Sequence, residues 1–364
     1  MAGHALSDED AVAAVQAAQE HGSVVDAAAA MGMPRSTLQS RVNTARERGL
    51  DTPGSQKTIY MHTPPFVADE IPEELPPIED LISRREDNWN RKNKTETAKK
   101  LVGVKVTTEG PIGIMLFGDI HIDDQGMNFP LFKEHLELAQ TEGMLAIWVG
   151  DLQNSWIGRL GHLYADQSTT AREALALMEW AIEEIGDRLI AIIEGNHDLW
   201  AKGINRKSPI EWIRDRGRFI SDEHGLRLGL RLPSGGEYII NCRHDFAGRS
   251  QWNPAHGVAK AAHLGWKDDV LIAGHTHVSG YNLLKDPASG KVSHALRIAS
   301  YKHWDSFAAS KGFPDQNIFE CPTLIIDPER KDDRHRVQVV LDPVEAAEYL
   351  TWKREKWKAR EGKS

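Results

Sequence analysis

The sequence contains only two cysteines, Cys242 and Cys321, among its 364 residues. Two thiols exclude a multi-disulfide framework and are too few for a zinc site built from four cysteines. The chain also lacks a run of about 18 apolar residues, the length needed for a membrane-spanning helix. Its opening residues, MAGHALSDEDAVAAV, have neither the basic nor the apolar region of a secretory signal. We therefore expect a cytoplasmic protein with no membrane partner.

Basic residues are fewer than acidic residues in this sequence. The sequence has 44 Lys and Arg against 53 Asp and Glu, which gives a formal net charge of -9. This balance excludes a protein that coats nucleic acid with its whole surface, but it leaves local basic patches open. Hydrophobic residues make up 40% of the chain, which is enough for one large α/β core with a smaller module attached.

The first 50 residues are Ala-rich and helical in pattern. They predict a helix from Val24 to Met31, a tight turn through Gly32 and Met33, and a second helix that begins at Pro34, where a missing N–H costs least. This order is typical of a helix-turn-helix domain, here residues 1–50. The second helix carries polar side chains that we expect to contact phosphates and base edges of DNA: Arg35, Ser36, Thr37, Gln39 and Arg41. An ordinary solvated helix in a small bundle is the alternative.

The composition changes over residues 51–110. The stretch HTPPFVADEIPEELPPIED is acidic and Pro-rich, which predicts an extended linker. The basic segment from Arg84 to Lys100 predicts a helix that either connects two domains or touches nucleic acid. Apolar strands and helical stretches then alternate over residues 111–345, which predicts an α/β domain with helices packed on sheets. A basic tail is expected at residues 346–364.

Five apolar stretches of this α/β region each end in a polar cluster: IGIMLF, LAIWV, LIAII, YII and VLIA. The clusters supply seven oxygen and imidazole donors, namely Asp119, His121, Asp151, Asn196, His244, His275 and His277. Because the carboxyl ends of successive strands converge on one edge of a sheet, we expect a single site. Such donors without a thiolate suit two divalent metal ions, with Mn expected and Fe, Zn or Ni as alternatives. Four glycines are expected to let the backbone turn sharply before these donors: Gly118, Gly150, Gly195 and Gly274.

The ordered motifs D-x-H, G-D-x-x-N, G-N-H-D, a lone His and G-H-T-H resemble those of the calcineurin-like metallophosphoesterase superfamily, in its nuclease-type branch. The resemblance covers residues 112–280 and implies a sandwich of mixed β-sheets flanked by helices. It also implies how the ligands are shared between two metals. The first metal would be held by Asp119, His121, Asp151 and His277. The second would be held by Asp151, as a bridge, together with Asn196, His244 and His275.

The same resemblance assigns roles to two residues outside the ligand set. His197 would face the phosphate, either to protonate the leaving oxygen or to stabilise charge in the transition state. Asp198 would orient His197. The motifs G-D-x-V-D-R-G and G-N-H-E, typical of Ser/Thr protein phosphatases, are absent, which argues against a protein phosphatase. Asn154 stands where the superfamily often has an aspartate, so the hydrogen bonding around one metal is left open.

The segments outside the α/β domain indicate which phosphoester to expect. They supply local positive charge, and the N-terminal helices resemble the small helix-turn-helix domains of bacterial and phage proteins. We therefore expect hydrolysis of phosphodiester bonds in DNA, by a nuclease or a DNA-end processing enzyme. A phage origin would place the protein in the host cytoplasm. Trp156, Trp200 and Trp252 follow the motifs and either stack bases or pack in the core.

Two other functions stay open. An enzyme that acts on small nucleotides or phosphodiesters would use the N-terminal helices for assembly. A DNA-binding regulator or packaging-type factor would have a catalytic site of secondary importance. The sequence also leaves open endo or exo cleavage and the formation of a homo-oligomer.

Overall fold

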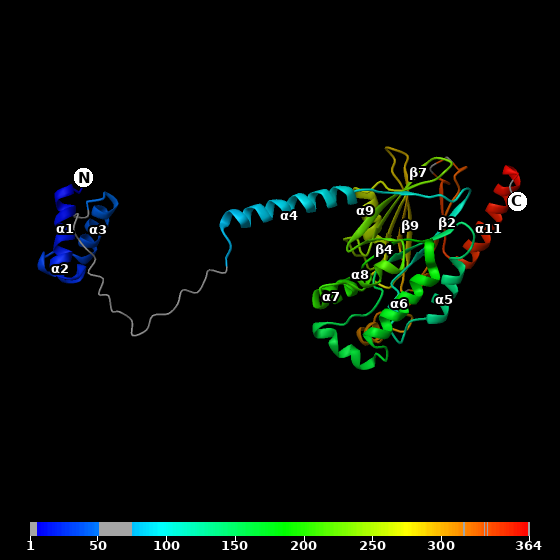
Figure 1. Ribbon diagram of the computed structural model, residues 1–364, viewed down its shortest axis with the longest axis horizontal. Helices are drawn as coiled ribbons and strands as arrows, with labels where there is room; N and C mark the ends of the chain where they lie inside the picture. Colours follow the sequence, from blue (N-terminus) through cyan, green and yellow to red (C-terminus); the bar gives the residue numbers. More distant parts are fainter. Residues whose placement is uncertain (1–5, 51–74, 316, 331, 333, 363–364) are drawn as a thin grey trace. The chain divides into compact units, whose positions relative to one another are not determined.

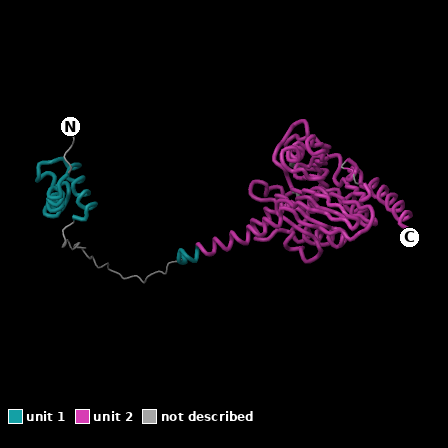
Figure 2. The backbone as a smooth tube through the Cα atoms, turned by 90° about the horizontal axis from the view of Figure 1, so that it is seen from above, with its two compact units in different colours: residues 1–81 teal, residues 82–364 magenta. Residues whose placement is uncertain are grey.

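The computed structural model describes residues 6–50, 75–315, 317–330, 332 and 334–362 (Figure 1). The chain divides into two compact units, Met1–Leu81 and Ile82–Ser364 (Figure 2). The acidic, Pro-rich linker expected after residue 50 falls largely in residues 51–74, outside the described residues. None of the helices in the described part of the chain combines the length and the apolar composition that crossing a bilayer requires.

The first unit contains three short helices, α1 (Asp8–Glu20), α2 (Val24–Ala30) and α3 (Arg35–Glu47). Ser7 and Ser23 cap α1 and α2, because each hydroxyl accepts a backbone N–H that the first helical turn leaves free. Alanines of α1 and α2 let the helices approach closely, and Leu38 and Val42 of α3 fill the space between them. The two helices predicted around the turn are present, but α3 begins at Arg35, one position after the predicted start, and Pro34 is its N-cap.

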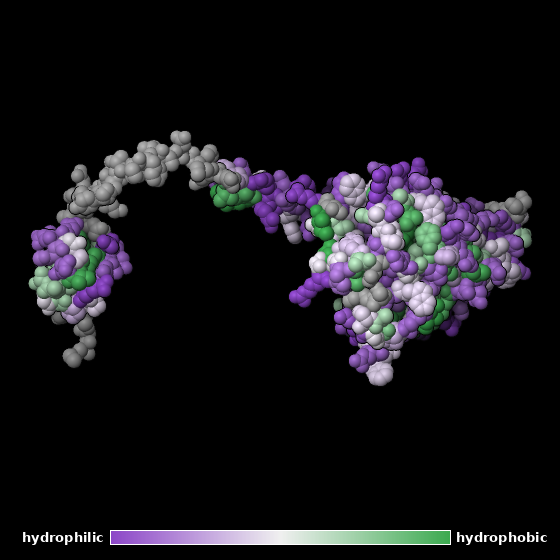
Figure 3. All heavy atoms as spheres, turned by 90° about the horizontal axis from the view of Figure 1, so that it is seen from below, coloured by the Kyte–Doolittle hydropathy of each residue, from purple (hydrophilic) through white to green (hydrophobic). Residues whose placement is uncertain are grey.

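A long helix, α4 (Ile78–Lys99), precedes the sheets. None of its residues is buried, and hydrophilic side chains follow most of its length (Figure 3). Lys99, at its C-terminus, forms an ion pair with Asp222, and a cation at this end also interacts favourably with the helix dipole. This helix contains nearly all of the basic segment that the sequence predicts between Arg84 and Lys100, but it begins at Ile78, inside the stretch predicted as an extended linker.

The second unit is built on two mixed β-sheets, each of six strands within the described residues (Figure 1). In spatial order, the first sheet consists of β12 (Val337–Val340), β11 (Thr323–Ile326), β2 (Ile112–Phe117), β3 (Met144–Val149), β4 (Leu189–Ile193) and β5 (Ile220–Asp222). The second consists of β1 (Val102–Lys105), β6 (Gly225–Arg231), β7 (Glu237–Arg243), β8 (Val270–Ala273), β10 (Val292–Arg297) and β9 (Gly280–Lys285). β2, β3 and β4 are parallel to one another, as are β7 and β8. The polar clusters that contain the candidate ligands follow the carboxyl ends of these five strands.

Helices cover the outer faces of both sheets. The first sheet packs against α5 (Phe129–Leu138), α6 (Ala171–Ile185) and α11 (Pro343–Glu361), and the second against α9 (His256–Leu264). The other helices are α7 (Asn196–Asn205), α8 (Pro209–Ile213), α10 (Ser306–Lys311) and the 3-10 helices Gly158–Asp166, Gly186–Arg188 and Arg214–Arg216. The expected fold class is confirmed at this level: an α/β sandwich of two mixed sheets flanked by helices.

The position of β2 explains why IGIMLF is apolar throughout. Successive side chains of a strand point to opposite faces of its sheet. Ile112, Ile114 and Leu116 enter the core between the two sheets, whereas Met115 and Phe117 pack under the helices. Both faces of the strand are covered, so all six residues are buried and no polar alternation appears.

Helix α11 corrects the expected basic tail at residues 346–364. The predicted boundary falls inside the helix, whose Ala346 and Leu350 belong to the core over the first sheet. Two of its basic residues, Lys353 and Arg354, are buried as well, and Lys353 Nζ forms an ion pair with Asp327 Oδ2 at 2.8 Å. Long basic side chains can cover apolar surface with their stems, so a high local content of Lys and Arg does not by itself indicate a solvated segment.

We predict that Arg354→Ala lowers the free energy of unfolding by about 3 kcal/mol. The guanidinium donates to the carbonyl oxygens of Glu109 (2.9 Å) and Pro111 (2.7 Å) and to Glu142 Oε1 (2.7 Å), so its loss removes a charged donor from these acceptors. Urea unfolding measures the effect. Arg360→Ala is the matched control on the exposed side of α11, with an expected change within about 0.5 kcal/mol. Equal destabilisation by both substitutions would contradict the structural role of Arg354.

Candidate metal centre

The seven candidate ligands follow β2, β3 and β4 of the first sheet and β7 and β8 of the second. Four of them have a positive φ: His121, Asp151, His275 and His277. Residues other than glycine rarely adopt this conformation, and they keep it only where the surrounding structure holds them. The concentration of such residues at the strand ends indicates a site that constrains the backbone.

Asp119, His121 and His277 bring three ligand atoms together. The Nε2 atoms of His121 and His277 are 3.1 Å apart, and His277 Nε2 lies 3.4 Å from Asp119 Oδ2. Asp119 and His121 are buried, and His277 is half-buried. The three atoms are close enough to share one ion. Together with Asp151, they are the set that the resemblance implies for the first metal.

Asp151, His244 and His275 form a second group that could hold an ion. His244 Nε2 lies 3.3 Å from Asp151 Oδ2 and 3.0 Å from His275 Nδ1. Asn196 Oδ1 lies 2.9 Å from the same imidazole nitrogen. The structure thus brings together the four residues that the resemblance implies for the second metal.

Asp151 lies between the two groups. Its Oδ2 is 3.3 Å from His244 Nε2 and 4.0 Å from His121 Nε2. Its Oδ1 accepts the backbone N–H of His197 at 2.9 Å, which fixes the carboxylate with Oδ2 toward the centre. A carboxylate in this position can bridge two ions about 3.5 to 4 Å apart.

The atoms at the centre fit a cation. His121 Nδ1–H donates to Asn154 Oδ1 at 2.9 Å, so the neutral ring carries its lone pair on Nε2. This lone pair faces His277 Nε2. Asp119 Oδ1 is buried and has no hydrogen-bond partner in the described part of the chain. Orphaned polar atoms of this kind are costly unless they meet an ion, and the nitrogen and oxygen donors suit Mn, Fe, Zn or Ni.

Protonation states at the centre also favour metal binding. Burial holds the pKa of His121 well below its ordinary value and lowers the pKa of His275 to about 4. Burial opposes ionisation of Asp151, but the adjacent imidazoles, His244 first, hold the pKa of this carboxyl well below its usual range. Burial also disfavours the charged form of His244, but Asp151 outweighs it and raises the pKa to about 9. A metal ion would find one carboxylate and two neutral imidazoles in the form that binds it, and would displace a proton from His244.

Asn154, which stands where the superfamily often has an aspartate, accepts the hydrogen bond that orients His121. Its Oδ1 accepts from His121 Nδ1–H, and its Nδ2 donates to Asp124 Oδ2 at 2.9 Å and to Gln167 Oε1 at 3.1 Å. The two acceptors fix the orientation of the amide. The amide in turn holds the ring of His121 with Nε2 toward the centre.

We predict that Asn154→Ala lowers the affinity for Mn²⁺ by roughly 10- to 100-fold, the usual effect of removing the partner of a ligating imidazole. Calorimetric titration of the metal-free protein measures this affinity. Gln153→Ala is the matched control, because Gln153 is the preceding residue and its amide donates to Ser155 Oγ at 3.0 Å rather than to a ligand. Wild-type affinity in the Asn154 variant would show that this hydrogen bond is dispensable.

His197 lies in the first turn of α7 and faces the centre. Its Nδ1 contacts the carbonyl oxygen of Asn154, which leaves Nε2 on the side of Asp151 Oδ2, 3.9 Å away. Burial lowers the pKa of His197. Its ring also forms a third group with atoms of His121 and Asp151 that are close enough to share an ion. The geometry therefore allows both a ligand and a non-ligand role for His197.

Asp198 is not placed to orient His197 as expected. Its buried carboxylate accepts the backbone N–H groups of Gly195 (2.9 Å) and Leu152 (3.2 Å). These bonds cap α7 and tie its start to the loop that carries Asp151. Consecutive residues of a helix point in directions about 100° apart, so adjacency in the sequence does not place Asp198 against the ring of His197.

Of the four glycines expected at sharp turns, only Gly150 has a positive φ, of +90°. Space is the reason for a glycine at the other three positions. A Cβ atom at Gly118 would lie 1.8 Å from the carbonyl oxygen of Ala299. A Cβ atom at Gly195 would lie 2.0 Å from Asp151 Oδ1, and one at Gly274 would lie 2.4 Å from Asp119 Oδ1. These two candidate ligands, Asp151 and Asp119, thus lie directly against the backbone of the neighbouring strand ends, where only glycine leaves room.

The three tryptophans near the motifs have different surroundings. The rings of Trp156 and Trp200 pack against His197, with centroid distances of 4.9 and 4.2 Å. Trp156 is buried, whereas 91% of Trp252 is exposed. Core packing therefore does not account for Trp252, while Trp156 and Trp200 form part of the wall beside the centre.

Two residues beyond the motifs also lie at the centre, and no motif of the sequence identifies them. Asp305 Oδ2 is 3.6 Å from His277 Nδ1. The buried Lys302 places its Nζ 3.3 Å from Asp305 Oδ1 and 2.9 Å from Asp124 Oδ2. Both residues come soon after β10, in SYKHWDSF. The available signal was a polar cluster soon after a strand, as it was for the ligands, although this strand, VSHALR, is not apolar.

In the first unit, the expected DNA-binding residues of α3 do not all point away from the other helices. Arg35, Ser36 and Thr37 are exposed, and Gln39 is half-buried and donates to a neighbouring amide on α3 at 3.1 Å. Arg41 instead lies toward α1, with NH1 3.8 Å from Asp10 Oδ1. An arginine engaged with a carboxylate on its own unit is less available to a phosphate than Arg35.

Comparisons with known proteins add no relative. A scan against protein-family models finds no match for this chain, and a search of the curated proteins finds none either. The class of protein is therefore defined by the fold and the centre themselves: an α/β sandwich with buried His and Asp groups that could hold a metal ion.

Proposed function

We propose that this chain is a dinuclear-metal-dependent phosphodiesterase of the calcineurin-like metallophosphoesterase superfamily that acts on DNA, as a nuclease or a DNA-end processing enzyme. The observation that carries the proposal is the position of Asp151 Oδ2, which faces both ligand groups, 4.0 Å from His121 Nε2 and 3.3 Å from His244 Nε2. The two mixed sheets support it, because the superfamily resemblance implies such a sandwich.

Two divalent ions bound at this centre would neutralise charge on a phosphoryl group and activate a water molecule. The chain's own contribution is proton transfer and positioning. With Nδ1 of His197 against the Asn154 carbonyl oxygen, the ring exchanges its proton at Nε2, on the side of the centre. The negative charge of a bound phosphate favours protonation of this nitrogen, and the proton can then pass to the leaving oxygen.

The first unit supports DNA as the substrate. Its helices α2 and α3 are joined by a short turn in which Gly32 has a φ of +61°, and α3 exposes Arg35 and Ser36. This is the order of elements in a helix-turn-helix, where the second helix contacts DNA. We assign the unit as a module that adds phosphate contacts to a protein of net negative charge.

Removal of residues 1–74 tests the proposal on two substrates. Cleavage of duplex DNA at low enzyme concentration should slow. The dependence of DNA affinity on salt should also flatten, by about 0.9 in logarithmic slope for each phosphate that the shortened chain no longer neutralises. Hydrolysis of bis-p-nitrophenyl phosphate should be unchanged, because all candidate ligands lie beyond residue 110. The measurement is paired kinetics with Mn²⁺ across a salt series.

Single substitutions refine the same test. Arg35→Ala should reproduce part of the DNA-binding defect. Arg41→Ala is the matched comparison, because Arg41 lies on the same helix and carries the same charge. Its effect should be smaller, because Arg41 is already engaged with Asp10. Undiminished DNA affinity and salt slope in the truncated chain would make the first unit an assembly element and favour small phosphodiesters as substrates. Absence of hydrolysis of either substrate by the full chain would refute the phosphodiesterase itself.

A further inference from the structure

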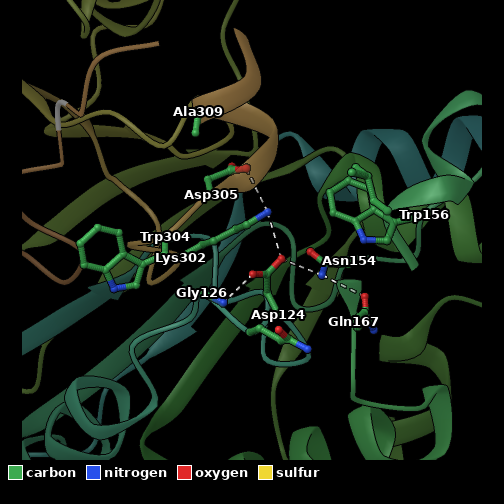
Figure 4. Close-up of a pocket in the computed structure, with 11 residues that line it drawn as sticks. Asp124, Gly126, Asn154, Trp156, Gln167, Lys302, Trp304, Asp305 and Ala309 are labelled. Carbon is green, nitrogen blue, oxygen red and sulfur yellow. Dashed lines mark hydrogen bonds and ion pairs between the residues drawn. The ribbon is translucent and has the colours of Figure 1, made fainter. Parts of the chain in front are cut away.

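A cavity of about 460 Å³ opens beside the metal centre (Figure 4). Its lining includes Asn154, whose amide holds the ligand His121, and Asp305, which lies 3.6 Å from the ligand His277. Two lining residues of the cavity, Asn154 and Asp305, thus lie next to residues of the first candidate ligand group. A substituent on a phosphate bound at the centre would reach the cavity.

The charges in the cavity argue against a second phosphate. Lys302 is the one cation among its described lining residues, and its Nζ lies 2.9 Å from Asp124 Oδ2 and 3.3 Å from Asp305 Oδ1. Figure 4 shows the ammonium group between the two carboxylates. Its positive charge is therefore compensated within the protein. A diphosphate chain would meet two carboxylates and no uncompensated cation among these lining residues, so the cavity suits an uncharged group.

Two indoles flank this ion pair. Trp156 and Trp304 lie on opposite sides of it (Figure 4), and Lys302 Nζ is 5.2 Å from the centroid of the Trp156 ring. Trp304 is 82% exposed, although its backbone is held firmly. The backbone N–H of Trp304 donates to the backbone carbonyl oxygen of Gly126 at 3.1 Å. The two main chains also lie in close contact, because a Cβ atom at Gly126 would lie 1.7 Å from the Trp304 carbonyl oxygen. A fixed main chain thus presents a large aromatic face to solvent.

The rest of the cavity lining includes a polar group that can form hydrogen bonds with the edge of a planar ligand. Gln125 lines the cavity and is exposed, and its side-chain amide has no hydrogen-bond partner in the described part of the chain. Aromatic faces with a few polar groups are what an uncharged heteroaromatic ring needs, because stacking supplies affinity and the amide supplies hydrogen bonds.

The geometry points to a nucleobase subsite: this cavity holds the base adjacent to the scissile phosphate, stacked on Trp304. The inference rests on the proposed phosphodiesterase function and specifies its substrate class. It distinguishes nucleotide diesters from phosphodiesters without a base. It also gives a role to the segment after β10, which carries Lys302, Trp304 and Asp305.

Three esters with the same leaving group test the subsite: thymidine 5′-p-nitrophenyl phosphate, methyl p-nitrophenyl phosphate and p-nitrophenyl phosphorylcholine. With Mn²⁺, we expect the thymidine ester to have a kcat/KM roughly 5- to 150-fold above that of the methyl ester, the range that base stacking supplies. Trp304→Ala should abolish this difference by slowing the thymidine ester alone, and Trp304→Phe should keep most of it. Trp212→Ala, an exposed tryptophan on α8 outside the cavity lining, is the control. Equilibrium binding of thymidine 5′-monophosphate should weaken in parallel with the kinetic loss.

Other outcomes overturn the inference in distinguishable ways. Hydrolysis of the thymidine and methyl esters with equal efficiency, or an equal loss on both in Trp304→Ala, would show that the cavity does not bind the base. A preference for the choline ester that depends on Trp304 would identify a site for a cationic headgroup instead. Absence of hydrolysis of all three esters by the wild-type protein would refute the proposed function, and the inference with it.

Discussion

Asp151→Asn should abolish phosphodiester hydrolysis almost entirely, with a fall in kcat/KM on the order of 10³-fold or more, because the substitution removes several kcal/mol of charge stabilisation. Asp151 Oδ2 faces both candidate ligand groups, so in the proposed dinuclear centre one change would affect both metal positions. Metal content measured by elemental analysis should fall together with activity. The fold should survive, because an asparagine oxygen can still accept the backbone N–H of His197 that Asp151 Oδ1 now accepts.

Asp187→Asn is the control for this substitution, since Asp187 is exposed and lies away from the centre. Its activity and metal content should equal those of the wild type. Near wild-type hydrolysis in Asp151→Asn, or full activity of the wild type in excess chelator, would rule out the dinuclear centre. Loss of bound metal by itself lowers the melting temperature, so thermal unfolding of both variants and the wild type is compared in the metal-free proteins. A lower melting temperature of metal-free Asp151→Asn would indicate a damaged fold rather than loss of the bridge.

His197→Ala should keep the metal content and lower turnover by roughly 10²- to 10⁴-fold, the usual scale for a lost general acid. The Nε2 atom is the one available for proton transfer, because Nδ1 contacts the Asn154 carbonyl oxygen. A general acid matters more for a poor leaving group. The loss should therefore be larger for an alkyl diester or DNA than for a p-nitrophenyl diester. A residue that only stabilises transition-state charge would slow both substrates alike.

His263→Ala, at an exposed histidine of α9, is the matched control for His197→Ala. Elemental analysis of both variants separates chemistry from binding. Loss of one metal equivalent in His197→Ala would show that His197 is a ligand, as its proximity to ligand atoms of His121 and Asp151 permits. In that case the general acid would have to be sought among other residues.

The sequence by itself determined the parts of this protein that depend on local pattern. Fully apolar stretches such as IGIMLF identify strands covered on both faces, and the donors that follow them identify the strand ends where a site forms. The helices of the first unit are similarly local, because their serine caps and alanine spacing lie within a few residues of one another. For these features the information sits in consecutive residues.

Only the tertiary structure decided which way individual side chains point and what they meet. Asn154 holds His121 from the adjacent strand end, Asp198 caps its own helix instead of orienting His197, and Arg41 turns toward α1. Helix α11 enters the core despite its basic composition, and Lys302 reaches the centre from a segment about 180 residues after the first ligand. These outcomes depend on contacts between segments that are distant in the chain, and the free energy of such contacts comes from burial and pairing that no local pattern records.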